Sequence, residues 1–167
     1  GELTGHFDLP VTCYYMSSPP EVLGPNIQSA HQNCVRNTVL GISRCCHTLP
    51  PSEPAENVTD LIELLTLLIR QDDRDLIHSN ILRLCMKWER EQRTIVASQA
   101  DLIFILKALA QNFHDRKERR IDSVFYVENI YCFSSSFEEL ASNFSLLLTE
   151  LFGAQGAAED QSLKGEQ

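Results

Sequence analysis

The sequence predicts an all-α fold, and two observations carry this prediction. Apolar residues recur every three or four positions along most of the chain between residues 26 and 152, which is the spacing that places them on one face of a helix. The stretch DLIELLTLLIRQDD from Asp60 recurs as DLIFILKALAQNFH from Asp101, an interval of 41 residues. A pattern that returns at such an interval indicates a stack of similar helical units.

The second half of the same unit recurs as well. VRNTVLGISRCC from Val35 aligns with IHSNILRLCMKW from Ile77, 42 residues later, and ELASNFSLLL from Glu139 is a weaker copy of the stretch at Asp60. The pattern resembles the armadillo and HEAT repeats, whose periods are about 40–47 residues. The resemblance covers about residues 26–152 and implies a short right-handed α-solenoid without a catalytic signature.

The predicted organisation is one folded domain with an arm and a tail. A length of 167 residues suits a single domain with a sizeable core. Residues 1–25 are expected to form an N-terminal arm or partial repeat that packs over the first helix, because FDLPVTCYYM is too apolar for a free tail. Residues 26–152 would form the helical-repeat domain, and the small, polar residues 153–167 a disordered tail.

Helix boundaries can be placed from prolines, capping residues and charged turns. Helices are expected near 26–46, 59–71, 76–92, 99–113, 121–132 and 137–152. Pro25 suits the first turn of the first helix, and Asp60 lies in the first turn of the second, where the helix dipole favours a carboxylate. Ser98 can cap the fourth helix, and Gly153 can close the last.

The fifth element is the least regular. IDSVFYVENIYCF, which starts at Ile121, places β-branched and aromatic residues close together, so strand and helix compete there. The repeat pattern requires a helix at this point. We therefore expect a helix.

The charge of the chain excludes one broad class of partner. The formal net charge is −9 and the isoelectric point is near 4.9. A protein that binds a nucleic-acid backbone needs a basic surface that displaces counterions. No direct nucleic-acid ligand is expected. The chain also lacks a run of 18 or more apolar residues, so no membrane contact is expected either.

The six cysteines of the chain indicate in which cellular compartment the protein is found. They are Cys13, Cys34, Cys45, Cys46, Cys85 and Cys132. Their density is well below that of a disulfide scaffold, and three of them fall within apolar helical stripes, where free cysteine acts as a small hydrophobe. Reduced thiols in the cytoplasm or nucleus are expected, with a disulfide framework left open by the even count.

No constellation for catalysis or metal binding stands out. The chain has no phosphate-binding glycine loop, no nucleophile elbow and no HExxH pair. Cys45, Cys46 and His47 together with Cys34 or Cys13 lack the paired CxxC spacing of a zinc site. We expect no catalytic residue, no metal and no cofactor, and therefore no enzyme.

The function expected is that of a non-catalytic scaffold that binds a peptide or helix of a partner protein within a larger complex. If the helices at Asp60 and Asp101 line one face, the residues outside their apolar stripes are Glu63, Thr66 and Arg70, then Phe104, Lys107 and Gln111. Phe104 replaces the carboxylate of Glu63 with an aromatic ring, which indicates a contact site. The single tryptophan, Trp88, is expected to fill the core.

A second candidate surface is the basic segment HDRKERR. The residues in it that would contact an acidic partner are Arg116, Lys117, Arg119 and Arg120. This is the one basic cluster in an acidic chain. It is also typical of a solvated turn between helices, and that interpretation is the simpler one.

A different class of protein remains as the alternative. The segment ERRIDSVFYVENIYCFSSSFEELASNFSLLLTELF resembles the last strand and helix of short-chain helical cytokines. That resemblance implies a secreted, disulfide-bonded four-helix receptor ligand. Two N-glycosylation sequons, at Asn57 and Asn143, would then matter. The internal interval of 41 residues has no explanation in such a bundle, and an unspecified helical domain or enzyme subunit is the third possibility.

Overall fold

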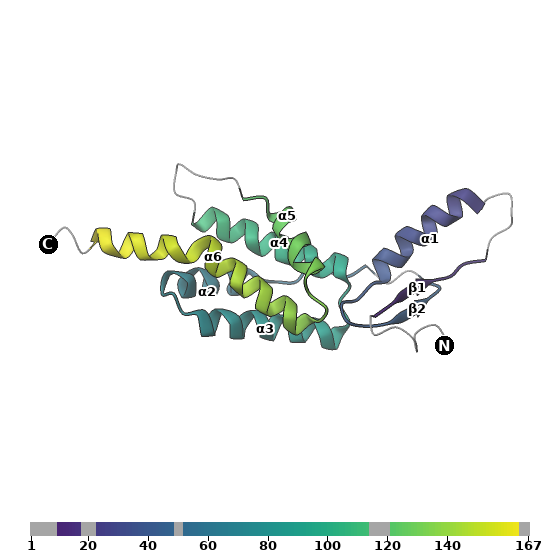
Figure 1. The fold of residues 1–167 in the computed structure, drawn as a ribbon, viewed down its shortest axis with the longest axis horizontal. Helices are drawn as coiled ribbons and strands as arrows, with labels where there is room; N and C mark the ends of the chain where they lie inside the picture. Colours follow the sequence, from purple (N-terminus) through teal and green to yellow (C-terminus); the bar gives the residue numbers. More distant parts are fainter. Residues whose placement is uncertain (1–9, 18–22, 49–51, 114–120, 164–167) are drawn as a thin grey trace.

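The computed structural model describes residues 10–17, 23–48, 52–113 and 121–163 (Figure 1). These residues are mainly helical, which confirms the predicted all-α class. The helices are α1 (Leu23–Asn37), α2 (Thr59–Arg70), α3 (Arg74–Glu91), α4 (Ile95–Asn112), α5 (Ser123–Cys132) and α6 (Phe137–Leu163). Two strands, β1 (Thr12–Tyr14) and β2 (Arg44–Cys46), pair in parallel as a short ribbon.

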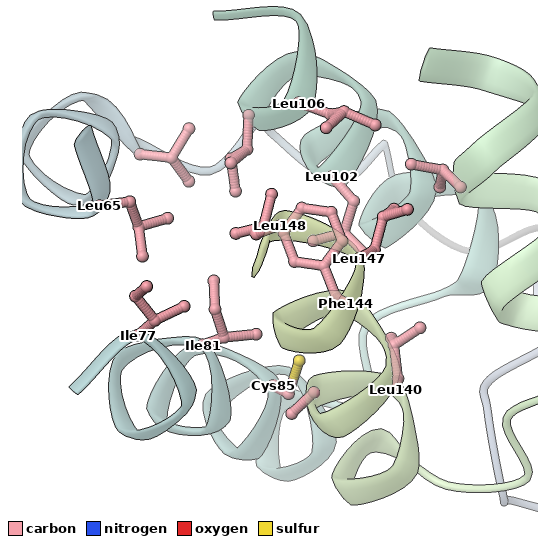
Figure 2. Close-up of a cluster of buried hydrophobic side chains, with 14 of the residues drawn as sticks. Leu65, Ile77, Ile81, Cys85, Leu102, Leu106, Leu140, Phe144, Leu147 and Leu148 are labelled. Atoms are coloured by element: carbon pink, nitrogen blue, oxygen red, sulfur yellow. The ribbon is translucent and has the colours of Figure 1, made fainter. Parts of the chain in front are cut away.

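The last helix is the centre of the core. α6 packs most extensively against α3 and also against α2 and α5. Figure 2 shows Phe144 and Leu148 of α6 surrounded by side chains from three other helices, including Ile81 of α3, Leu65 of α2 and Leu102 of α4. All five of these side chains have no exposed surface. The core is therefore organised around α6.

Local capping explains where several helices begin. Asp73 caps α3 by accepting a hydrogen bond from the Leu76 amide at 3.1 Å, and Thr94 caps α4. At the start of α6, Ser136 Oγ accepts from the Glu139 amide at 3.1 Å, which is half of a capping box. Gln92, with a φ of 52°, ends α3 in the left-handed conformation.

The predicted first helix, 26–46, is wrong in its second half. α1 ends at Asn37, and residues 44–46 form β2. Between them Val39 and Ile42 form an isolated bridge around Gly41, whose φ of 74° allows the chain to reverse. The predicted recurrence from Val35 therefore aligns a turn and a strand with α3.

The described part of the predicted N-terminal arm, residues 10–17, contains the strand β1, and α1 packs against this strand. Residues 12–14 of β1 pair with residues 44–46 of β2 in register, and α1 packs against β1. Cys34 on α1 donates a hydrogen bond to the Thr12 carbonyl at 3.1 Å. The ribbon and α1 lie at one end of the molecule (Figure 1).

Two later boundaries also differ from the predictions. α4 begins at Ile95 with Thr94 as its cap, so Ser98 lies inside the helix, where its hydroxyl donates to the Thr94 carbonyl at 2.9 Å. α6 does not close at Gly153 but continues to Leu163, which places a helix in the first part of the predicted tail. The competing segment from Ile121 forms the helix α5, as expected.

The relation between the copies is partly visible in space. α2 and α4 lie side by side and run in the same direction, because Glu56 contacts Asp101 near the middle of α4 and Thr66 contacts Asn112 at its end. Equivalent helices of consecutive repeats would run this way. However, α6 packs on α2 and α3, whereas a solenoid repeat contacts its neighbours alone. The stacked solenoid arrangement is not confirmed.

Within the described ranges, no helix combines the length and the apolar character needed to cross a membrane.

Candidate interaction surface

The solvent-facing side of α4 carries a continuous row of exposed residues. The row, called here the α4 stripe, consists of Val96, Ala100, Phe104, Lys107 and Gln111. Successive members are three or four positions apart, so they lie on one face of the helix. Val96 is 47% exposed and Phe104 is 57% exposed. Its first three members are apolar, which gives α4 an apolar half and a polar half on the solvent side.

The opposite side of α4 is fully buried. Leu102, Ile105, Leu106 and Leu109 have no exposed surface and belong to the core around α6. Phe104 thus lies on the solvent-facing side of α4, away from the core. Its exposure follows from its position on the helix.

The three predicted residues on α2 have different surroundings. Glu63 is exposed. Thr66 Oγ1 accepts a hydrogen bond from Asn112 Nδ2 at 3.0 Å, and the Arg70 guanidinium lies 5.7 Å from the centroid of the Phe113 ring. Thr66 and Arg70 therefore hold the end of α4 against α2, while Glu63 is available for contact on the same side.

A buried ion pair fixes the start of α4. Arg93 Nη2 lies 2.6 Å from Asp101 Oδ2, and Arg93 Nε donates to the same oxygen at 2.9 Å. Arg93 also donates to the Pro54 carbonyl at 2.9 Å, and the Glu56 amide donates to Asp101 Oδ1 at 3.2 Å. The pair thus ties the segment before α2 to the junction between α3 and α4.

Two further contacts extend this network. Glu53 accepts from the Thr94 amide and hydroxyl, and Lys87 Nζ donates to Glu56 at 2.6 Å. Burial raises the pKa of the Asp101 carboxyl, while the Glu56 amide and then Arg93 lower it in part. The network positions the first turns of α4, which carry the apolar half of the α4 stripe.

A hydroxyl pair joins α5 to α4. Tyr131 donates to Ser98 Oγ at 2.6 Å, and both side chains are buried. Burial raises the pKa of the Tyr131 phenol. The pair fixes the orientation of α5 on the flank of α4 with neutral groups.

The structure describes all six cysteines and joins none of them by a disulfide. Cys13 and Cys45 are register partners in the ribbon, and Cys85 is buried in the core, where burial raises the pKa of its thiol to about 12. In the described part of the chain, no group of three or more His, Cys, Asp or Glu side chains is arranged to hold a metal ion.

Trp88 fills the core, as predicted. It has no exposed surface, and its ring meets Phe137 edge to face with centroids 6.5 Å apart. The basic candidates Arg116, Lys117, Arg119 and Arg120 lie outside the described residues.

Several exposed apolar residues were missed by sequence reasoning. Val96 and Ala100 extend the row of Phe104, and their spacing of four was the signal that could have found them. Leu67 on α2 is 56% exposed. Phe133, which follows α5, is 79% exposed.

Comparison with protein-family models, with curated proteins and with solved structures finds no match to this chain.

Proposed function

We propose that this chain is a non-catalytic protein-interaction domain that binds a peptide or helix of a partner protein along the α4 stripe. The observation that carries the proposal is the exposed apolar half of that stripe, with Phe104 57% exposed directly opposite a fully buried leucine face. An amphipathic partner helix buries such a row through its own apolar positions. Lys107 within the stripe and the exposed Glu63 on the neighbouring helix α2 offer charges of both signs.

The helical-repeat architecture belongs to the same proposal. In this interpretation α2–α3 and α4–α5 are two copies of a helix pair, and α6 covers the core that a third pair would cover in a longer array. The parallel direction of α2 and α4 supports it, through the contacts of Asp101 and Asn112 described above. We place the activity inside the cell, as part of a larger complex, because reduced cysteines suit that compartment.

Phe104→Ala tests the proposal, with Leu146→Ala as its matched control. Leu146 is exposed to the same degree, at 59%, but lies on α6. We expect both variants to keep the wild-type melting temperature, because exposed residues without internal contacts contribute less than about 0.5 kcal/mol. We expect Phe104→Ala alone to weaken binding of the physiological partner, by about thirtyfold if Phe104 is a hot spot.

The partner is found by replacing Phe104 with the photoreactive residue benzoylphenylalanine in cells and identifying what becomes cross-linked. The same replacement at Leu146 gives the background. Cross-links of equal yield at both positions, or unchanged partner binding by Phe104→Ala, would remove the α4 stripe from the binding site.

A further inference from the structure

The corner between α5 and α6 exposes a second group of apolar side chains. Phe133, in the turn between the helices, is the most exposed large apolar residue in the described ranges. Val124 and Phe125 on α5 are 42% and 58% exposed, and Cys132 is exposed as well. These residues follow one side of α5 toward the turn. A group of exposed apolar side chains marks an interaction site more often than a single exposed residue does.

Phe133 stands between two hollows in the surface. The first is lined by Phe133, Ser136, Glu138, Glu139, Ser142 and Asn143. The second is lined by Pro10, Leu40, Gly41, Cys132, Phe133, Ser134, Ser135 and Glu139. Phe133 and Glu139 line both hollows. An apolar ring thus lies between two depressions that each contain a carboxylate.

The backbone of this corner is held in place by side chains of α6. Asn143 Nδ2 donates to the Phe133 carbonyl at 3.3 Å and to Ser134 Oγ at 2.9 Å. Glu139 Oε2 accepts from the amide and the hydroxyl of Ser135, both at 2.7 Å. A corner fixed in this way loses little conformational freedom when a partner binds, which favours affinity.

Among the described residues, the two hollows are lined by the carboxylates of Glu138 and Glu139 and by no lysine or arginine. Residues 121–153 contain five acidic side chains and no lysine or arginine. The acidic residues are Asp122, Glu128, Glu138, Glu139 and Glu150. The hydrogen bonds from Ser135 lower the pKa of the Glu139 carboxyl, so it stays ionised at neutral pH. Anionic lipid and nucleic acid would be repelled by these carboxylates, whereas a cationic segment would be attracted.

We propose that the α5–α6 corner is a docking surface for a basic amphipathic segment of a partner protein. Such a segment packs an apolar side chain on Phe133 and places lysine or arginine side chains in the hollows beside Glu138 and Glu139. This surface is separate from the α4 stripe. The two proposals can therefore fail independently.

Three synthetic peptides of about 16 residues test the proposal, because shorter helices are marginal in water. They share one stripe of leucine and phenylalanine and carry lysine, glutamine or glutamate at all polar positions. Binding to the full chain is measured by fluorescence anisotropy at several salt concentrations. We expect the lysine peptide to bind at least about tenfold more tightly than the glutamine peptide, and more weakly as salt rises. We expect no binding of the glutamate peptide.

Variants locate the binding site of the lysine peptide. Phe133→Ala should weaken binding by about thirtyfold, the loss typical of a hot-spot aromatic, and should fold normally because Phe133 is 79% exposed. Glu138→Gln should weaken binding and reduce its salt dependence. Glu150→Gln, which removes an exposed carboxylate about three turns further along α6, should leave binding unchanged.

Three results would overturn this assignment. Equal weakening by Glu150→Gln and Glu138→Gln would mean general attraction to an acidic protein. Unchanged binding by Phe133→Ala would remove the corner from the site. The third result would be a dimer of the chain, detected by analytical ultracentrifugation, that Phe133→Ala abolishes. A second copy of the chain, and not a partner protein, would then occupy the corner.

Discussion

Arg93 and Asp101 form an ion pair with little access to solvent, since their side chains are 8% and 5% exposed. Breaking such a pair by removing one partner leaves an unpaired buried charge, which costs about 3–5 kcal/mol. We expect Arg93→Met to lower the free energy of unfolding by about this amount at pH 7. Urea denaturation followed by circular dichroism measures it. The double variant Arg93→Met/Asp101→Asn should recover most of the loss, because the asparagine oxygen can still accept from the Glu56 amide.

The same variant has a defined pH dependence. Burial raises the pKa of Asp101, and Arg93→Met removes a group that opposes this shift, so the folded pKa moves further above the unfolded value. The folded state then holds the proton more tightly, and stability is lost as pH rises through the folded pKa. We expect the stability deficit of Arg93→Met relative to the wild type to be smaller at about pH 5 than at pH 7. An equal stability deficit at pH 5 and pH 7 would show that the charge of the Asp101 carboxyl does not cause the loss of stability.

The six thiols give a second test at the scale of single residues. Cys45 and Cys132 are exposed and should react promptly with a thiol reagent in the native protein. Cys85 should not react until the protein unfolds, because it is buried and its pKa near 12 leaves almost no thiolate. Unreduced protein in denaturant should give six thiols. Fewer than six would establish disulfides and favour the secreted, cytokine-like alternative.

Single residues also show how far the sequence could predict the candidate site. The exposure of Phe104 follows from helical spacing, because Leu102, Leu106 and Leu109 lie on the opposite side of α4 and define its buried face. The roles of Asp101 and Ser98 could not be found in this way. Asp101 looks like the first-turn carboxylate at Asp60, yet its partners, Arg93 and the Glu56 amide, reach it only through tertiary packing.

At the scale of elements, α6 shows why its end was misplaced. A glycine after an apolar stripe is a common signal for a helix end, but the structure continues α6 through Gly153. Gly153 does not have a positive φ, and a Cβ placed there would lie 3.5 Å from the Thr149 side chain, an ordinary contact. The prediction of a helix end therefore rested on residue type alone.

Gly153→Ala distinguishes the two possibilities. Alanine inside a helix is more stable than glycine by about 0.5–1 kcal/mol, so we expect the variant to melt at a higher temperature. If the helix instead ended at Gly153 in the left-handed conformation, alanine would be strained and the melting temperature would fall. Gly41→Ala is the control for that second case. It combines a φ of 74° with a Cβ position 3.1 Å from the Ser135 carbonyl, and should be destabilising.

The strands mark the limit of prediction from periodicity. Helices α2, α3 and α4 span 12 to 18 residues, long enough for the apolar stripe to be recognised. β2 has three residues, too few for alternation to be visible, and it follows α1 with apolar spacing that continues the helical pattern by chance. It is specified by its pairing with β1, which lies 32 positions earlier in register.

At the scale of the whole molecule, the chain consists of a helical bundle with the ribbon and α1 at one end (Figure 1). Buried and hydrogen-bonded residues join the two parts. Val39 is 2% exposed, the Ile95 amide donates to the Thr38 carbonyl at 2.8 Å, and Arg44 donates to Gln92 at 2.6 Å. The bundle has its own core around α6 and does not use β1.

Deleting residues 1–19 tests this division. The deletion removes β1, so β2 loses its partner strand and α1 loses the surface on which it packs. We expect faster hydrogen exchange in residues 23–46 and unchanged protection in α3. Trp88, the only tryptophan, is fully buried in the bundle, so its fluorescence reports the unfolding of the bundle alone. The melting midpoint of Trp88 fluorescence should move little.

Tyr15→Pro, which removes the hydrogen bond from the Tyr15 amide to the Cys46 carbonyl, should also speed hydrogen exchange in residues 23–46, but by less than the deletion does. A large fall in the Trp88 midpoint upon deletion would mean that ribbon and bundle unfold as one cooperative unit, because the contacts of Thr38 and Arg44 with the bundle would then transmit the loss of β1 into the core.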